Sequence, residues 1–186
     1  MDSAPPADLF IIPSSRFETS GDHWYDWLAN EKSEKGFEVV APRFPGGQLQ
    51  TFKNWMHVFE EHAHTVNENT IVVGHSLGGK FLLSLLEKQK VGAAILVAAP
   101  YREEPILWRN VLNKPDGSSG FWDQVPNWEL IRAHANLFSL FYGDNDKLIS
   151  AEQPRTLSDE LRSPITWIRN GGHLDEKSHF TEFRLL

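Results

Sequence analysis

The residues of this sequence best suited to chemistry surround Ser76, within the pattern Gly74-His75-Ser76-Leu77-Gly78. Glycines two residues either side of a serine permit a tight strand-to-helix turn, because no side chain stands where the two backbones approach. The turn leaves the serine hydroxyl at its tip, where it can act as a nucleophile. Such a pattern arises by chance in roughly one chain in twenty of this length, so its flanks must support the interpretation.

The flanks have the composition that such a turn requires. Residues 71–73 form a short β-branched run that is typical of a buried strand. The apolar residues of 81–86 recur at helical spacing. The sequence therefore predicts a strand, a sharp turn that carries Ser76, and an amphipathic helix.

A serine nucleophile needs a base within hydrogen-bonding distance and a third group that orients this base. Around a turn of this kind the chain order is serine, then Asp or Glu, then His. His173 follows two glycines, just after a predicted strand at 165–168, and is the expected base. His179 is a rival a few residues later, whereas His75 is expected to point away into the turn.

Two aspartates compete for the role of the acid. Asp144 and Asp146 both follow a predicted strand at 137–142, and in a parallel sheet their loop shares the carboxyl edge with Ser76 and His173. Asp146 is favoured because it sits deeper in the loop, before a segment that leads to a helix, while Asp144 is equally suited to capping the turn. We therefore expect Ser76, Asp146 and His173 to act as nucleophile, acid and base.

Hydrolysis through a tetrahedral intermediate also requires two donors aimed at the oxyanion. One is expected from the backbone N–H of Leu77, at the start of the helix, where the helix dipole favours negative charge. The second is expected from the loop after the first strand, at Ser14 or Ser15. The choice between these two is open, because no His-Gly-Gly-Gly run marks the donor.

The length and the net charge of the chain limit the number of domains and the kinds of partner that we expect. The 186 residues are enough for one domain, 1–186, with a sizeable core. A net charge of −7 without clustered Lys or Arg argues against a nucleic-acid partner and against an anionic membrane surface. No apolar stretch is long enough for membrane insertion, and the first residues carry an acid where a signal peptide needs basic residues. We expect a cytoplasmic protein.

The sequence offers no site for a metal or a cofactor. It has no cysteine, which excludes thiolate metal sites, disulfides and a cysteine nucleophile. His62 and His64 lie two residues apart on a predicted helix, where their rings face different directions, and no His-Glu-x-x-His is present. No P-loop or Gly-x-Gly-x-x-Gly follows a predicted strand, so we expect no nucleotide cofactor.

Short apolar runs alternate with helical segments along the chain. The runs expected to form strands are 9–13, 37–41, 71–73, 93–100, 137–142 and 165–168. Their alternation with helices predicts βαβ units, and hence an α/β fold with a mainly parallel sheet and helices on both faces. Residues 101–127 are less regular and contain Trp108 and Trp122, so they are expected to form either a modest lid or a surface excursion whose aromatic side chains pack down.

Further motifs extend over nearly the whole chain: Ile12-Pro13, His23-Trp24-Tyr25-x-Trp27, Gly74-His75-Ser76-x-Gly78, the loop 143–146, Gly172-His173 and Phe180-Thr181-Glu182-Phe183. In this combination the chain resembles the small single-domain serine hydrolases related to retinoblastoma-binding protein 9, within the α/β-hydrolase superfamily. The resemblance implies a three-layer α/β-hydrolase fold without a large cap. It also implies Ser76 as nucleophile, Asp146 as acid and His173 as base.

The chain departs from this family at two places. Family members named for retinoblastoma-protein binding look like they carry a Leu-x-Cys-x-Glu segment before the nucleophile strand. The corresponding region here, residues 61–69, contains no cysteine. This difference argues against a retinoblastoma-protein partner. The chain also stops at Leu186, where a terminal helix would begin, so a shortened C-terminus is expected.

The leading hypothesis is therefore a serine hydrolase that cleaves a carboxylic ester or amide of a small-molecule substrate, through an acyl-enzyme on Ser76. The alternative is a protein-interaction module on a hydrolase scaffold, with little or no catalytic activity. In that case the aromatic segment 101–127 would be the binding surface, since a fold does not guarantee an activity.

Overall fold

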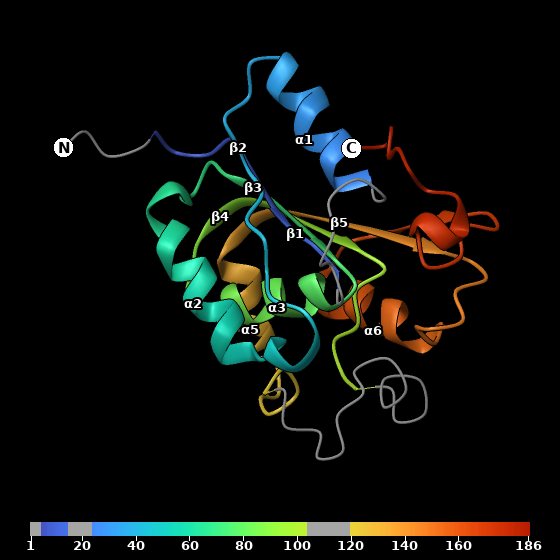
Figure 1. The fold of residues 1–186 in the computed structure, drawn as a ribbon. Helices are drawn as coiled ribbons and strands as arrows, with labels where there is room; N and C mark the ends of the chain where they lie inside the picture. The colour runs from blue at the N-terminus through green and yellow to red at the C-terminus, as the bar shows by residue number, and fades with distance from the viewer. Residues whose placement is uncertain (1–4, 15–23, 104–119) are drawn as a thin grey trace.

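Six strands from the described residues, which are 5–14, 24–103 and 120–186 of the computed structural model, form one sheet (Figure 1). In chain order they are β1 (Leu9–Ile12), β2 (Val39–Val40), β3 (Ile71–His75), β4 (Val91–Val97), β5 (Ala135–Gly143) and β6 (Ile165–Ile168). Their order in the sheet is β2-β1-β3-β4-β5-β6, and every neighbouring pair is parallel. The predicted α/β fold with a mainly parallel sheet is confirmed.

Helices cover both faces of this sheet. In the described ranges they are α1 (Trp24–Glu34), α2 (Phe52–His62), α3 (Leu77–Leu85), α5 (Trp128–Ala133) and α6 (Glu152–Leu161), with short 3-10 turns at η1 (Gly47–Leu49), η2 (Ala63–Thr65) and η3 (Glu176–Ser178). The chain crosses the sheet in one direction from β1 to β2 and in the other direction from β2 to β6. Right-handed crossovers therefore place α1 on the face opposite to the other helices, as Figure 1 shows for α2, α3 and α5. None of the described helices combines the length and the apolar character needed to cross a bilayer.

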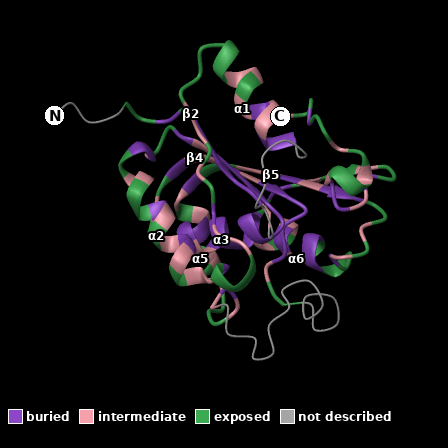
Figure 2. Ribbon diagram, in the orientation of Figure 1, coloured by how far each residue is buried: buried purple, intermediate pink, exposed green. Residues whose placement is uncertain are grey.

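Each face of the sheet has its own apolar core. On the face covered by α2, α3, α5 and α6, the core residues come from strands and helices alike and include Phe10, Trp55, Phe81, Leu140 and Leu157. On the α1 face, the core joins strands, α1 and the C-terminal segment: Ile11, Trp24, Leu28, Leu174 and Phe183. Figure 2 shows the buried strands between these two layers. The C-terminal segment thus completes a layer that α1 covers only in part.

The strand order reverses between β1 and β3. The chain leaves β1 toward one edge of the sheet and leaves β3 toward the other, and open α/β sheets commonly place their sites at the carboxyl ends of such a pair. Ile12 of β1 lies opposite Gly74 of β3 in the parallel register. Ser76 therefore emerges beside the loop that follows β1.

Most strands overlap the predicted apolar runs, and two runs were drawn too long. The strand expected over 93–100 is β4, which ends at Val97, and Ala98 leaves it with a φ of 45°. A strand was expected over 37–41, whereas only Val39 and Val40 pair with β1. β2 is an edge strand and its two residues are half-buried, so fewer packing contacts favour a strand over the rest of the run 37–41. Of the segment 101–127, predicted as a lid or an excursion, residues 104–119 lie outside the described residues.

Lys80 is a charged residue buried within α3. It is 2 % exposed, and its Nζ donates to Ser84 Oγ at 3.4 Å, at the long end of hydrogen-bonding distance. Burial lowers the pKa of the Lys80 ammonium to about 8, although the nearby charge of Glu87 acts in the opposite direction. The folded state therefore holds this proton less tightly than the unfolded chain does.

Replacing Lys80 by Met is expected to raise the free energy of unfolding near neutral pH by on the order of 3 kcal/mol, because the cost of burying a charge disappears. In the wild type this cost is present below the folded-state pKa of about 8 and is removed as the pH rises toward the unfolded value of 10.5. Urea denaturation of both proteins between about pH 7 and about pH 10 measures the difference. This difference should shrink as the pH rises, and a constant difference would contradict the analysis.

Candidate active site

Ser76 occupies the turn between β3 and α3. Its backbone has φ 53° and ψ −121°, in a region that side-chain-bearing residues rarely adopt. The surrounding structure holds this conformation: Ser76 N–H donates to Val97 O at 2.8 Å, and Ser76 O accepts from Gly79 N–H at 2.9 Å. The predicted strand, sharp turn and helix are therefore present around Ser76.

Gly74 and Gly78 are required by close contacts of the backbone in this turn. A Cβ on Gly74 would lie 2.7 Å from Gly78 O. A Cβ on Gly78 would lie 2.3 Å from Pro13 O and 2.4 Å from Ile12 O. Since both obstacles are main-chain atoms, the absence of a side chain allows α3 to start directly against the end of β1.

His173 lies in the loop after β6, and its ring faces Ser76. Its Nε2 is 2.9 Å from Ser76 Oγ, and its Nδ1 is 2.8 Å from Asp146 Oδ2. The preceding Gly172 has a φ of 54°, and its N–H donates to Asn145 Oδ1 at 2.7 Å. The loop that carries the imidazole is thus fastened to the loop that carries the carboxylate.

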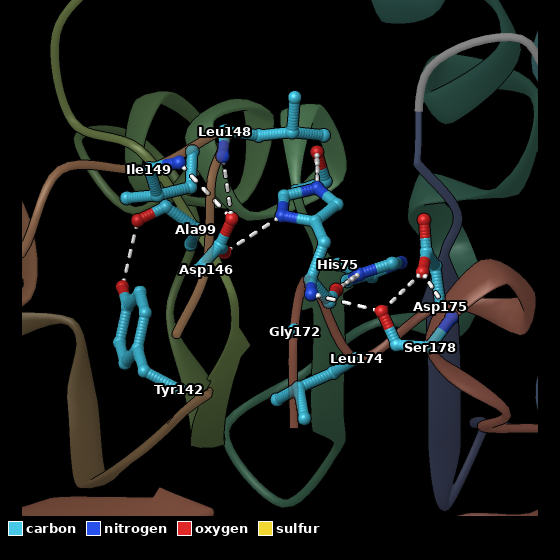
Figure 3. Close-up of polar contacts among 12 residues, drawn as sticks. His75, Ala99, Tyr142, Asp146, Leu148, Ile149, Gly172, Leu174, Asp175 and Ser178 are labelled. Carbon is cyan, nitrogen blue, oxygen red and sulfur yellow. Dashed lines mark hydrogen bonds and ion pairs between the residues drawn. The ribbon is translucent and has the colours of Figure 1, made fainter. Parts of the chain in front are cut away.

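Asp146 is held by the backbone that follows it. Its Oδ1 accepts from Leu148 N–H at 2.7 Å and from Ile149 N–H at 3.2 Å, which leaves Oδ2 for His173 (Figure 3). A carboxylate can only accept, so His173 Nδ1 carries the proton and Nε2 offers its lone pair to Ser76 Oγ. The side chains of His173 and Asp146 are only 9 % and 4 % exposed, so water competes little for these bonds.

Asp144, the rival for the acid, is used elsewhere. Its Oδ1 accepts from Asn170 N–H at 2.7 Å and so caps the loop after β6. Of the two aspartates, the structure brings Asp146 to His173. The rival base, His179, is exposed at the end of η3 with a φ of 66°.

His75 has contacts that the sequence did not indicate. It was expected to point away into the turn, and in the structure its ring is fully buried and bonded at both nitrogens. Nε2 lies 2.9 Å from the backbone oxygen of His173, and Nδ1 bonds the hydroxyl of Tyr25. Sequence reasoning missed this role of Tyr25, although its place beside Trp24 and Trp27 belonged to a motif already singled out.

The expected oxyanion donors have different surroundings. Leu77 is the first residue of α3, where an N–H has no acceptor within the helix, so it is available to an oxyanion. The N–H of Ser14 instead donates to the hydroxyl of Tyr25 at 3.1 Å, a geometry that does not favour it as the second donor. Ser15 lies outside the described residues.

Within residues 5–14, 24–103 and 120–186, no three His, Asp or Glu side chains lie close enough together to hold an ion. What the described residues do assemble is a hydroxyl, an imidazole and a carboxylate in one hydrogen-bonded line. Such a line can deprotonate the hydroxyl and stabilise the resulting imidazolium.

Comparison with known proteins identifies a family to which the sequence is similar. The family model described as "Serine hydrolase" matches residues 9–185. The chain is 24 % identical over 182 residues to YdeN of Bacillus subtilis (strain 168), covering 96 % of this chain and 91 % of that protein. It is 25 % identical over 185 residues to "Serine hydrolase RBBP9" of Rattus norvegicus, covering 98 % and 93 %.

Solved structures with the same fold include the ydeN gene product of B. subtilis. It aligns with a TM-score of 0.81 and 23 % identity over 95 % of this chain and 92 % of that one. The esterase domain of a Rhodothermus marinus protein aligns with a TM-score of 0.64 and 18 % identity over 96 % and 84 %. At these identities the likeness concerns the fold, and it confirms the expected α/β-hydrolase architecture.

Substituting Gly78 by Ala is expected to destabilise the protein by about 2 to 3 kcal/mol, because the new methyl group meets main-chain atoms of Ile12 and Pro13. Gly36→Ala is the control: Gly36 has a φ of 88° but open space around it, so only backbone strain of about 1 kcal/mol is expected. Thermal and urea unfolding of the two variants provide the measurement. Equal losses would show that the close packing around Gly78 is not a constraint.

Proposed function

Because the chain belongs to the serine hydrolase family, we propose that it cleaves a carboxylic ester or amide through an acyl-enzyme formed on Ser76. One observation carries the proposal: His173 connects Ser76 Oγ, at 2.9 Å, with Asp146 Oδ2, at 2.8 Å. Both distances are those of direct hydrogen bonds, so no rearrangement is needed before proton transfer.

The first half of the proposed reaction forms the acyl-enzyme. Nε2 of His173 takes the proton of Ser76 Oγ as this oxygen attacks the substrate carbonyl, and the carbonyl oxygen becomes an oxyanion. The N–H of Leu77 donates to this oxyanion, where the N-terminus of α3 also favours negative charge. The intermediate then collapses, the bond to the leaving alcohol or amine breaks, and His173 gives its proton to that group.

The second half releases the acid. A water molecule gives a proton to Nε2 of His173 and attacks the acyl carbon, and the new intermediate expels Ser76 Oγ, which regains the proton. Asp146 stays ionised throughout and stabilises the imidazolium that forms in both halves. The overall reaction consumes one water and yields a carboxylic acid with an alcohol or an amine.

The site itself supports an ester or amide as the bond that is cleaved. Its groups supply a nucleophile, a proton carrier and a backbone donor for an oxyanion, which are the requirements of acyl transfer. The matched relative "Serine hydrolase RBBP9" bears the name of the same reaction class.

Ser76→Ala is expected to abolish labelling by a fluorophosphonate probe, because the probe forms its bond with the serine oxygen. His173→Ala should slow labelling by about a thousand-fold, since the oxygen then lacks its base. Labelling is followed by intact mass, with circular dichroism to verify folding. An equal adduct on Ser76→Ala would refute the assignment of the nucleophile.

Asp146→Asn is expected to lower kcat/KM for p-nitrophenyl acetate by about a hundred-fold to ten-thousand-fold. The new amide still accepts from the backbone through its oxygen, but its NH2 group opposes the Nδ1 proton of His173. Asp144→Asn is the matched control: its amide oxygen can still accept from Asn170 N–H, so a change of less than about five-fold is expected. The reverse ranking would transfer the role of acid to Asp144.

A further inference from the structure

Tyr25 and His75 form a buried pair that connects the two loops beside Ser76. Tyr25 lies on α1 and is 3 % exposed, and His75 ends β3 and is fully buried. At one end of the pair, Ser14 N–H donates to the Tyr25 hydroxyl at 3.1 Å. At the other end, His75 Nε2 reaches the backbone oxygen of His173 at 2.9 Å (Figure 3).

The partners determine where the protons of this pair lie. A backbone oxygen can only accept, so His75 Nε2 carries a proton and donates to His173 O. In the neutral ring, Nδ1 is then an acceptor, and the Tyr25 hydroxyl donates to it. Burial raises the pKa of the Tyr25 hydroxyl, which keeps it protonated and able to donate. The bonds therefore run in one direction, from Ser14 through Tyr25 and His75 to His173.

His75, the last residue of β3, and Ser76, the next residue in the turn, hold His173 at two different points. Ser76 Oγ meets the ring of His173, and His75 meets its backbone carbonyl. Since His75 and Ser76 are consecutive, a shift of the His173 backbone away from β3 stretches both bonds. The peptide on the other side of His173 is held separately, because His173 N–H donates to Ser178 Oγ at 3.2 Å.

We propose that His75, supported by Tyr25, is a positioning residue that holds the backbone of His173 where its imidazole reaches Ser76 Oγ. This inference rests on the proposed function of His173 as the base. Through Ser14 the same bonds also tie the loop after β1, from which the second oxyanion donor is expected. Displacements of about 1 Å in such a site can lower the rate about a hundred-fold.

α1 provides a second anchor on the same loop, which supports this assignment. Trp24 Nε1–H donates to the backbone oxygen of Leu174 at 2.9 Å. Two consecutive residues of α1 therefore hold two consecutive carbonyls: Trp24 holds that of Leu174 directly, and Tyr25 holds that of His173 through His75. A pair that served only to fill the core could be replaced by apolar side chains at little cost. Here both polar ends of the pair terminate on backbone next to the site.

The test compares three variants by steady-state kinetics with p-nitrophenyl acetate. His75→Leu removes the donor to His173 and is expected to lower kcat by about thirty-fold or more with KM within about two-fold. His75→Gln can place an amide N–H where Nε2–H was, and kcat should recover to within about five-fold of wild type. Tyr25→Phe, which keeps the ring, should lower kcat by about five-fold to ten-fold.

The double variant Tyr25→Phe/His75→Leu separates positioning from general packing. If Tyr25 acts through His75, its substitution costs no further activity once His75 is Leu, so the two effects are not additive. Tyr142→Phe is the matched control, because Tyr142 is another buried tyrosine whose hydroxyl donates to a backbone oxygen, that of Ala99, at 2.6 Å. It should lose thermal stability as Tyr25→Phe does, but keep kcat within about two-fold.

Each outcome has a defined consequence. Loss of kcat in folded His75→Leu, recovery in His75→Gln and non-additivity with Tyr25→Phe would support the positioning role. If His75→Leu does not fold, the test rests on Tyr25→Phe and His75→Gln. The proposal is overturned if Tyr25→Phe has wild-type kcat, or if Tyr142→Phe loses as much kcat as Tyr25→Phe does. A third outcome is that wild type turns over the substrate, Ser76→Ala does not, and every variant of Tyr25 and His75 has wild-type kcat. That outcome would overturn this inference alone. Absence of turnover in wild type would overturn the proposed function and this inference together.

Discussion

The position of His173 is the constraint on which the rest of the structure depends. Its ring must lie within hydrogen-bonding distance of both Ser76 and Asp146, at 2.9 and 2.8 Å. Such bonds need donor–acceptor distances of about 2.7 to 3.2 Å and weaken steeply when the angle at the hydrogen falls below about 120°, so three loops far apart in sequence are placed within these limits. The parallel sheet does most of this work, because the carboxyl ends of β3, β5 and β6 all open toward the same edge.

Backbone strain and buried polar groups are also found near this edge. Ser76 keeps an uncommon φ because the packing of α3 against β1 leaves the turn little alternative. The polar side chains of Tyr25 and His75 are buried with partners, so their burial carries no large penalty. Lys80, on the same helix that starts at the turn, is different, since within the described part of the chain its ammonium has only a long bond to Ser84. Burial without a strong partner is what lowers its pKa.

The strands and the nucleophile's turn could be predicted because their signals are local. Apolar runs report burial on both faces of a parallel sheet, and the glycines around Ser76 report a close approach of backbones within a few residues. Chain order then placed an acid and a histidine after later strands. Position in the loop favoured Asp146 but left Asp144 as a rival, because both lie in one loop and both are suited to accept backbone N–H groups. The edge strand β2 was overestimated for a related reason, since pairing at an edge depends on the neighbour rather than on composition.

Local residue patterns were therefore sufficient for the fold class and for the sharp turn at Ser76, and they named His173 as the candidate base. Three-dimensional packing was needed to bring Asp146 to His173, to engage the N–H of Ser14 with Tyr25, and to reveal that His75 bonds the backbone of His173. Propensity and periodicity act over one turn or one strand, whereas these hydrogen bonds join side chains from different elements. Their geometry is set by how the strands twist and how α1 and the C-terminal segment pack across the sheet, which no local pattern encodes.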